Sequence, residues 1–163
     1  MNCSYRPLTV EDGARLDRLM PAIFDERFGE GWTGAQVVAS LASAVRCWGE
    51  LLRVDGETAG FSLTRQIADE AELLLVGVVP SLRSSGLGRA LILRAIAQAE
   101  MKNARTLHLE VRENNAVARR VYESLGFKII GRRKSYYGGV DGKRHDAVTM
   151  QVSLQNENSE LGS

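Results

Sequence analysis

A glycine-bearing loop between an apolar strand and a helix is the segment of this chain best suited to bind an anion. The stretch from Val76 to Leu91 begins apolar, passes through Gly86 and Gly88, and continues with helical spacing. Glycines let the backbone approach a ligand closely, and the unpaired N–H groups in the first turn of a helix favour phosphate. Arg83 and Arg89 add positive charge. The loop is therefore predicted to bind phosphate, although glycines that serve only a turn are the alternative.

A glutamate stands within an otherwise apolar strand further along the chain. In the run from Thr106 to Val111, alternation places three apolar residues on one face and leaves Glu110 on the other. A partly buried carboxylate there is suited to accept a proton from an attacking amine, directly or through water. The alternative is a salt bridge, with Arg112 or an arginine of the last predicted hairpin as partner. Glu72, on the neighbouring strand, is the second candidate for the base.

Asn115 and Tyr122 are seven residues apart on the next predicted helix. At about 100° per residue they differ by only about 20° in direction, so both can contact one ligand. For Tyr122 alone, a core aromatic residue with a hydrogen-bonded hydroxyl is the alternative. Tyr136 and Tyr137, in the last hairpin, either cradle the end of a peptide or pack within the hairpin.

These motifs together resemble those of a known enzyme family. Arg83-x-x-Gly86-x-Gly88 after an apolar strand resembles the acetyl-coenzyme A motif of the GNAT superfamily of N-acetyltransferases. More narrowly, the chain resembles the bacterial RimI type, the ribosomal-protein-alanine N-acetyltransferases, over about residues 4 to 154. The segments that carry this narrower resemblance are Glu110-Val111-Arg112, Asn115-Ala116, the run Tyr122 to Phe127, and the hairpin segments Arg132 to Tyr137 and His145 to Ala147.

The resemblance implies acetyl-coenzyme A as cosubstrate and a direct attack of the amine, for which Cys47 is not needed as a nucleophile. It implies that the Tyr122 hydroxyl lies near the sulfur and protonates the departing thiolate. We expect the backbone N–H groups of Val76 and Val78 to hold the pantetheine, with Gly77 allowing close approach. The expected cofactor-binding residues are Val76, Gly77, Val78, Arg83, Ser84, Ser85, Gly86, Leu87, Gly88, Arg89 and Asn115, and the expected catalytic residues are Glu110 and Tyr122.

The acceptor amine is partly decided by its basicity. At pH 7 an α-amino group of pKa about 7.8 is about 14% neutral, whereas a lysine of pKa about 10.4 is only about 0.04% neutral. The resemblance implies the N-terminal alanine of a protein of the small ribosomal subunit. A small amine such as a polyamine or a drug is the alternative acceptor. A non-catalytic acetyl-coenzyme A sensor is the other alternative, and it would need neither Glu110 nor Tyr122.

Periodicity and turn signals predict the elements that must position these residues. Two capping boxes, Thr9 with Asp12 and Thr33 with Gln36, predict two N-terminal helices, the second ending before Cys47. The predicted strands are 4–7, 50–54, 59–64, 73–79, 106–111, 127–131 and 147–154, the later helices are 86–102 and 116–125, and a loop joins the last two strands. We therefore expect an α/β (mixed α+β) fold. It is a single GNAT-like domain, residues 1–154, whose mixed, largely antiparallel sheet of six to seven strands has helices on both faces. Residues 155–163 are expected to form a disordered tail.

Composition limits the remaining possibilities. The 163 residues carry 21 Lys and Arg against 20 Asp and Glu, so the net charge of +1 supplies no general attraction for nucleic acid or a membrane. We expect no direct nucleic-acid binding, no membrane segment, a cytoplasmic location, and a monomer or weak homodimer. Two isolated cysteines and two histidines predict neither a disulfide framework nor a metal site. The basic cluster from Arg132 to Lys134 is expected to be solvated, and contact with the adenosine phosphate of the cofactor or with a ribosomal surface is the alternative.

Overall fold

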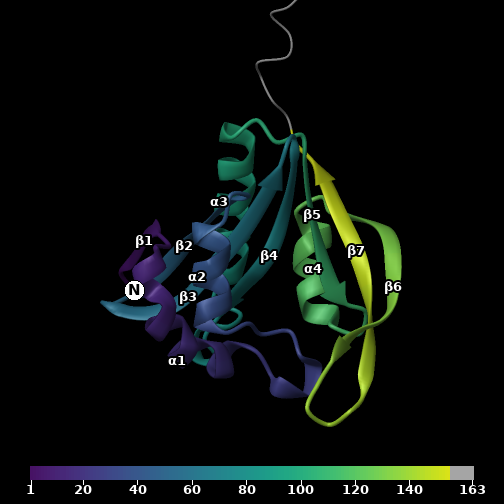
Figure 1. The fold of residues 1–163 in the computed structure, drawn as a ribbon, viewed down its shortest axis with the longest axis horizontal. Helices are drawn as coiled ribbons and strands as arrows, with labels where there is room; N and C mark the ends of the chain where they lie inside the picture. The colour runs from purple at the N-terminus through teal and green to yellow at the C-terminus, as the bar shows by residue number, and fades with distance from the viewer. Residues whose placement is uncertain (155–163) are drawn as a thin grey trace, which may run out of the picture.

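Seven strands form one sheet in the order β1-β2-β3-β4-β5-β7-β6 in the computed structural model, which describes residues 1–154 (Figure 1). The strands are β1 (Cys3–Pro7), β2 (Arg46–Val54), β3 (Glu57–Ile67), β4 (Glu70–Val78), β5 (Thr106–Arg112), β6 (Lys128–Gly138) and β7 (Arg144–Ser153). The helices are α1 (Gly13–Ile23), α2 (Gly34–Ala42), α3 (Leu87–Met101) and α4 (Ala116–Ser124), with short 3-10 turns η1 (Val10–Asp12), η2 (Glu26–Phe28) and η3 (Pro80–Leu82). All neighbouring strands are antiparallel except β4 and β5, which confirms the mixed, largely antiparallel sheet.

Helices cover both faces of this sheet, as the sequence predicts. Strand alternation directs neighbouring residues to opposite faces, so Leu51 packs with Leu16 of α1 and Val37 of α2, whereas Leu52 packs with Leu91 of α3. A third cluster joins α3 and α4 to β5 and β7. Both capping boxes form, at Thr9 before η1 and at Thr33 before α2.

The parallel pair β4 and β5 separates after three paired residues. Pairing runs from Glu70 opposite Thr106 to Glu72 opposite His108, and no later residues of the two strands pair within the described chain. Just beyond, the β3–β4 register slips so that Leu74 is an extra residue in β4, which forms a β-bulge. The two strands start side by side and spread apart towards their C-terminal ends (Figure 1). The facing edges therefore hold backbone groups that the ladder does not use.

Three predicted boundaries are wrong. The second helix ends at Ala42, because Ser43 adopts an extended conformation and its hydroxyl donates to the Val45 carbonyl, and β2 begins at Arg46. The loop predicted between residues 131 and 147 is largely strand, since β6 reaches Gly138 and β7 begins at Arg144. A register shift after Arg133, with Ser135 at φ 53°, breaks the alternation that would have revealed these strands.

Three further expectations concern the C-terminal tail, a membrane-spanning helix and a metal site. The predicted tail, residues 155–163, lies outside the described residues. None of the helices in residues 1–154 is long and apolar enough to cross a membrane. The same part of the chain contains no group of three His, Cys, Asp or Glu side chains able to hold a metal ion.

Candidate active site

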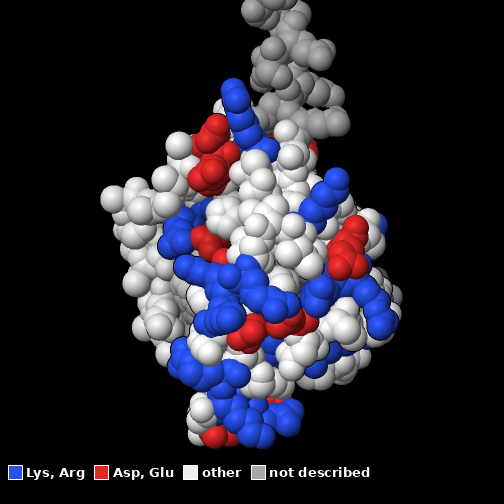
Figure 2. All heavy atoms as spheres, turned by 90° about the vertical axis from the view of Figure 1, so that its right-hand side faces the viewer, with Lys and Arg blue, Asp and Glu red and all other residues white. Residues whose placement is uncertain are grey.

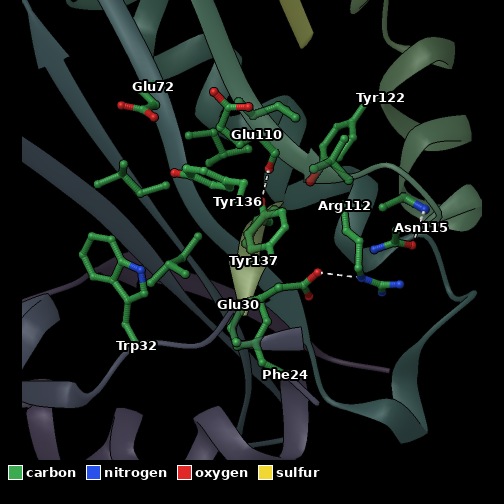
Figure 3. A pocket seen from close by; sticks show the side chains of 18 residues that line it. Phe24, Glu30, Trp32, Glu72, Glu110, Arg112, Asn115, Tyr122, Tyr136 and Tyr137 are labelled. Atoms are coloured by element: carbon green, nitrogen blue, oxygen red, sulfur yellow. Dashed lines mark hydrogen bonds and ion pairs between the residues drawn. The ribbon is translucent and has the colours of Figure 1, made fainter. Parts of the chain in front are cut away.

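A cavity of about 460 Å³ occupies the opening between β4 and β5 (Figure 3). Both strands supply walls of this cavity, and α4, the connection between α1 and α2, and the β6–β7 hairpin close it from the other sides. The predicted residues that the structure brings together here are Glu72, Val76, Glu110, Asn115, Tyr122, Tyr136 and Tyr137. The separation of two strands thus collects groups that lie up to 65 positions apart in the sequence.

Glu110 is held in the cavity by the neighbouring strand. The β5–β7 register pairs it with Thr149, whose hydroxyl lies 3.0 and 2.8 Å from the two carboxylate oxygens. Arg133 of β6 contributes a longer contact, 3.6 Å from Nη1 to Oε1, so the ion-pair partner is the hairpin arginine and not Arg112. A hydroxyl donates only one hydrogen, which leaves most acceptor sites of this carboxylate open to an amine.

Glu72 faces the same cavity from β4 but is more closely paired. Its Oε2 lies 2.5 Å from Arg65 Nη2 and 3.9 Å from His108 Nε2. The arginine is its direct cross-strand neighbour in the β3–β4 register, so the pairing follows from the sheet. This direct ion pair engages Glu72 within the sheet, whereas the arginine nearest to Glu110 lies 3.6 Å away.

Tyr122 points its hydroxyl from α4 towards the centre of the cavity (Figure 3). Its ring packs edge-to-face on Phe127 at 5.6 Å, and the residue is 8% exposed. Within residues 1–154 the hydroxyl makes no hydrogen bond, so it is free to meet a ligand. Burial raises the pKa of Tyr122 above its usual value, and the nearby negative charge of Glu30 raises it further. The phenol therefore stays protonated at neutral pH and is suited to donate a proton.

Tyr137 is oriented by β5 itself. Its hydroxyl donates to the backbone carbonyl of Glu110 at 3.0 Å, and its ring meets Tyr136 edge-to-face at 4.8 Å. Burial, followed by the negative charge of Glu30, raises the pKa of the Tyr137 hydroxyl. Because this hydroxyl is already engaged, the side chain serves as a wall of the cavity. The two tyrosines therefore pack within the hairpin and line the cavity, and their contact with a peptide end stays a prediction.

Asn115 both caps α4 and lines the cavity. Its Oδ1 accepts a hydrogen bond of 3.2 Å from the Ala118 N–H, which is a helix N-cap, and its amide N–H groups remain for a ligand. Asn115 and Tyr122 both line the cavity, which agrees with the shared face predicted from their spacing. The contact of Asn115 with the cofactor stays a prediction.

The loop before α3 has the form of an anion-binding cradle. Gly86 is the N-cap of α3 at φ 85° and supplies no side-chain cap, so the first N–H groups of the helix keep no such partner. A methyl group added at Gly86 would meet nothing within 4 Å, and one at Gly88 would meet only Val78 Cγ2 at 4.0 Å. The φ of Gly86 by itself favours glycine, whereas neither packing nor a positive φ requires Gly88 to lack a side chain. The N–H groups of the first turn of α3 therefore face open space, as an anion-binding site requires.

Side chains expected at the cofactor are partly engaged elsewhere. Arg83 Nη2 donates to the Ile23 carbonyl at the end of α1, 2.7 Å away, and Arg89 Nη1 lies 2.5 Å from the Ser124 hydroxyl of α4. The Ser85 hydroxyl donates to the Leu82 carbonyl. Beside this loop, Ser84 has φ 63° and Leu87 is buried against the sheet. These contacts fix the shape of the loop, so its backbone N–H groups are the part free to bind.

Gly77 lacks a side chain for a different reason than expected. A methyl group there would overlap Ile23 Cγ2, so this glycine lets α1 pack closely on β4. The adjacent Val76 and Val78 belong to the part of β4 that has lost β5 as a neighbour. Their backbone remains available for the pantetheine contact that the sequence predicts.

Sequence reasoning missed two residues that orient groups of the site, Thr149 and Glu30. Thr149 orients Glu110, and Glu30 pairs with Arg112 at 2.9 Å. The pairs Thr149–Glu110 and Glu30–Arg112 each join residues far apart in the chain, so no local sequence pattern predicts them. The spacing of Glu110 and Arg112 on one face of β5 is the only hint that the sequence offers.

The basic cluster of the last hairpin is partly neutralised. Figure 2 looks onto the side of the molecule formed by β6 and β7, where Lys and Arg side chains gather with several acidic residues among them. Arg132 pairs with Glu113, and Arg133 contacts both Glu110 and the ring of Tyr136. Lys134 is exposed. The cluster thus supports the wall of the cavity as well as facing solvent.

Comparison with known proteins agrees with this fold and cavity. Residues 15–127 match the acetyltransferase (GNAT) family, and the chain belongs to that family. It is 42% identical over 103 residues to the [ribosomal protein bS18]-alanine N-acetyltransferase of Escherichia coli, covering 63% of this chain and 69% of that protein. The Haemophilus influenzae enzyme of the same name is 38% identical over 100 residues, 61% of this chain and 68% of that one.

Solved structures extend the similarity to nearly the whole chain. The crystal structure of the Escherichia coli ribosomal-protein-S18-alanine N-acetyltransferase superposes with a TM-score of 0.84 at 30% identity, covering 98% of this chain and 99% of that one. Arabidopsis thaliana NAA60 in complex with acetyl-CoA shares the fold, with a TM-score of 0.77 at 19% identity over 94% and 99% of the two chains. The protein is an N-acetyltransferase that uses acetyl-coenzyme A.

Proposed function

We propose that this protein acetylates the α-amino group at the N-terminus of a protein, and that a ribosomal protein beginning with alanine, equivalent to bS18, is its acceptor. The observation that carries the proposal is the meeting of Glu110 and Tyr122 in one cavity of a chain 42% identical to the bS18-specific enzyme of Escherichia coli.

In this proposal the cavity performs the two proton transfers of the reaction. Acetyl-coenzyme A supplies the acetyl thioester and leaves as the thiol. Glu110, oriented by Thr149, accepts the proton that the amine must lose. Tyr122, whose buried phenol is protonated, donates a proton towards the departing sulfur. The N–H groups from Ser84 to Arg89 and the free backbone at Val76 and Val78 hold the cosubstrate, with Asn115 as a further contact.

The charge of the cavity favours an α-amino acceptor over a polyamine. Three glutamates line it, but each has an arginine partner: Glu30 with Arg112, Glu72 with Arg65, and Glu110 with Arg133. Little uncompensated negative charge is left to select a multiply charged amine. A single carboxylate base suffices for an amine that is already partly neutral at pH 7.

Mass spectrometry of the products tests this assignment. The purified protein is incubated with acetyl-coenzyme A and peptides varied at their first two residues. Each peptide is matched with a copy that is formylated at its N-terminus and keeps one internal lysine, and spermidine is assayed in parallel. We expect acetyl groups only on free N-termini, fastest on those beginning with alanine. Faster acetylation of spermidine or of the internal lysine would refute the assignment.

A further inference from the structure

The connection between α1 and α2, residues 24–33, crosses the mouth of the cavity. In Figure 1 this segment runs from the end of α1, below the sheet, to the tip of the β6–β7 hairpin. The contact there is close: Val140 N–H donates to the Glu26 carbonyl at 3.3 Å, and a methyl group at Gly139 would overlap the Arg27 carbonyl. Phe24, Glu30 and Trp32 of the segment face the cavity, so its position defines one wall of the site.

Arg112, the last residue of β5, anchors this segment from inside the fold. Its Nε donates to Glu30 Oε1 at 2.9 Å, and its guanidinium lies 3.5 Å from the centre of the Phe28 ring. A second nitrogen of the Arg112 guanidinium is held by Asn114, whose Oδ1 accepts a hydrogen bond from Nη1 at 2.8 Å. The Arg112 and Glu30 side chains are only 13% and 19% exposed, so solvent screens this pair less than a surface pair. Phe28 also meets His145 of β7 edge-to-face at 5.1 Å.

We propose that Arg112 is a positioning residue for the acceptor, because it holds residues 24–33 at a fixed distance from Glu110. The two side chains share one face of β5 two positions apart, so one short stretch of backbone carries both the proposed base and the anchor of the opposite wall. An N-terminal residue bound between that wall and the strand is thereby aligned with the base. This inference rests on the proposed function, since it assumes an acceptor that fills the space between the segment and the hairpin.

The geometry requires arginine and not merely a positive charge. A planar guanidinium can pair with Glu30, stack on Phe28 and donate to Asn114 at the same time. Lysine in its place keeps the charge but loses the stacking and the fixed fork. Arg112→Lys therefore separates anchoring from electrostatics. Glu30→Gln removes the same ion pair from the segment side and leaves β5 untouched.

A matched control exists within the segment. Arg27 pairs with Asp25 at 2.6 Å, but both are exposed and both belong to residues 24–33, so this pair ties the segment only to itself. Arg27 also lies over the Phe28 ring, but at 5.4 Å against 3.5 Å for Arg112. Arg27→Lys therefore repeats the chemical change of Arg112→Lys without removing the Glu30–Arg112 pair.

The test combines steady-state kinetics with hydrogen–deuterium exchange of residues 24–33 in the free protein. For Arg112→Lys and Glu30→Gln we expect the acceptor KM to rise about tenfold, with kcat within about threefold and acetyl-coenzyme A affinity unchanged. Amide exchange in the segment should rise about tenfold in both variants. The double variant should be no worse than the more severe single variant, because both remove one interaction. Arg27→Lys should match the native protein in each measurement.

Two results overturn the inference. Exchange in residues 24–33 that does not change in Arg112→Lys and Glu30→Gln shows that the pair does not hold the segment. Faster exchange without a change in acceptor KM shows that holding the segment does not position the acceptor. If the native protein acetylates no peptide, the proposed function fails. The exchange measurement still decides whether Arg112 anchors the segment. If Arg112→Lys lowers the Tm, Glu30→Gln alone carries the comparison.

Discussion

Replacing Gly88 with alanine should raise the free energy of unfolding of the protein and lower its affinity for acetyl-coenzyme A. Gly88 is the second residue of α3 and has no positive φ, so alanine can adopt its conformation. The added methyl group would meet only Val78 Cγ2 at 4.0 Å, an ordinary van der Waals contact. Nothing in the protein opposes the substitution, and any loss must come from the ligand.

The gain in stability follows from helix propensity. Glycine is about 0.8–1.0 kcal/mol less favourable than alanine within a helix, and the first turn realises part of this difference. The free energy of unfolding should therefore rise by about 0.5–1 kcal/mol. For a chain of this size that corresponds to a Tm about 1–4 °C higher.

The loss in affinity follows from the open space above the N–H groups of α3. A methyl group in that space keeps the pyrophosphate from approaching the backbone and removes at least one hydrogen bond to a charged oxygen, worth about 1.5–3 kcal/mol. The Kd for acetyl-coenzyme A should rise roughly 10- to 100-fold. Isothermal titration calorimetry measures the affinity, and a thermal melt without ligand measures the stability.

A control on the same helix changes the stability of the protein without changing its affinity for acetyl-coenzyme A. Ala97 is an exposed position of α3 in the following turns, so Ala97→Gly should lower the stability by about 1 kcal/mol and leave the affinity unchanged. Native affinity in a Gly88→Ala protein with a raised Tm would show that the pyrophosphate does not bind at this loop.

Four other substitutions test the proton donor, the choice of base and the stability of the fold. Tyr122→Phe should lower kcat by roughly 10² or more with acetyl-coenzyme A affinity nearly intact, and full activity in that variant would remove Tyr122 as the acid. Glu110→Gln should lose most activity at pH 7 and recover part of it as the pH approaches the pKa of the acceptor amine, while Glu72→Gln should keep the native pH profile; the opposite pattern would exchange their roles. Asp12→Asn should lower the free energy of unfolding by about 2 kcal/mol at pH 7, because the Arg6 hydrogen bond holds the pKa of Asp12 well below its usual value. That contribution is fully present above the unfolded pKa of about 3.9 and is lost as the pH falls towards the folded value, so the free energies of unfolding of variant and native protein, measured by urea titration, should begin to approach each other below about pH 4.

Local signals predicted most of the elements because their causes are local. The capping boxes at Thr9 and Thr33 involve residues three positions apart, and both form. The Asp55-Gly56 pair between β2 and β3 is typical of a hairpin turn that needs two residues with positive φ, and the structure has 50° and 86° there. The β6 strand was underestimated for the opposite reason. The irregular residue Ser135 interrupts its alternation, and pairing with β7, which the sequence does not display, restores the strand beyond it.

The two candidate bases of the site also show the difference between local signals and pairing between distant strands. The sequence placed Glu72 and Glu110 on neighbouring strands and left both as bases, since residue type and alternation are the same for each. Register separates them, because the cross-strand neighbour of Glu110 is Thr149 and that of Glu72 is Arg65. Glu110 therefore meets a hydroxyl at 2.8 Å and an arginine only at 3.6 Å, whereas Glu72 meets a guanidinium at 2.5 Å. The sequence shows where the carboxylates are, but the partner of each carboxylate comes from the strand beside it, and strand register is not visible in the sequence.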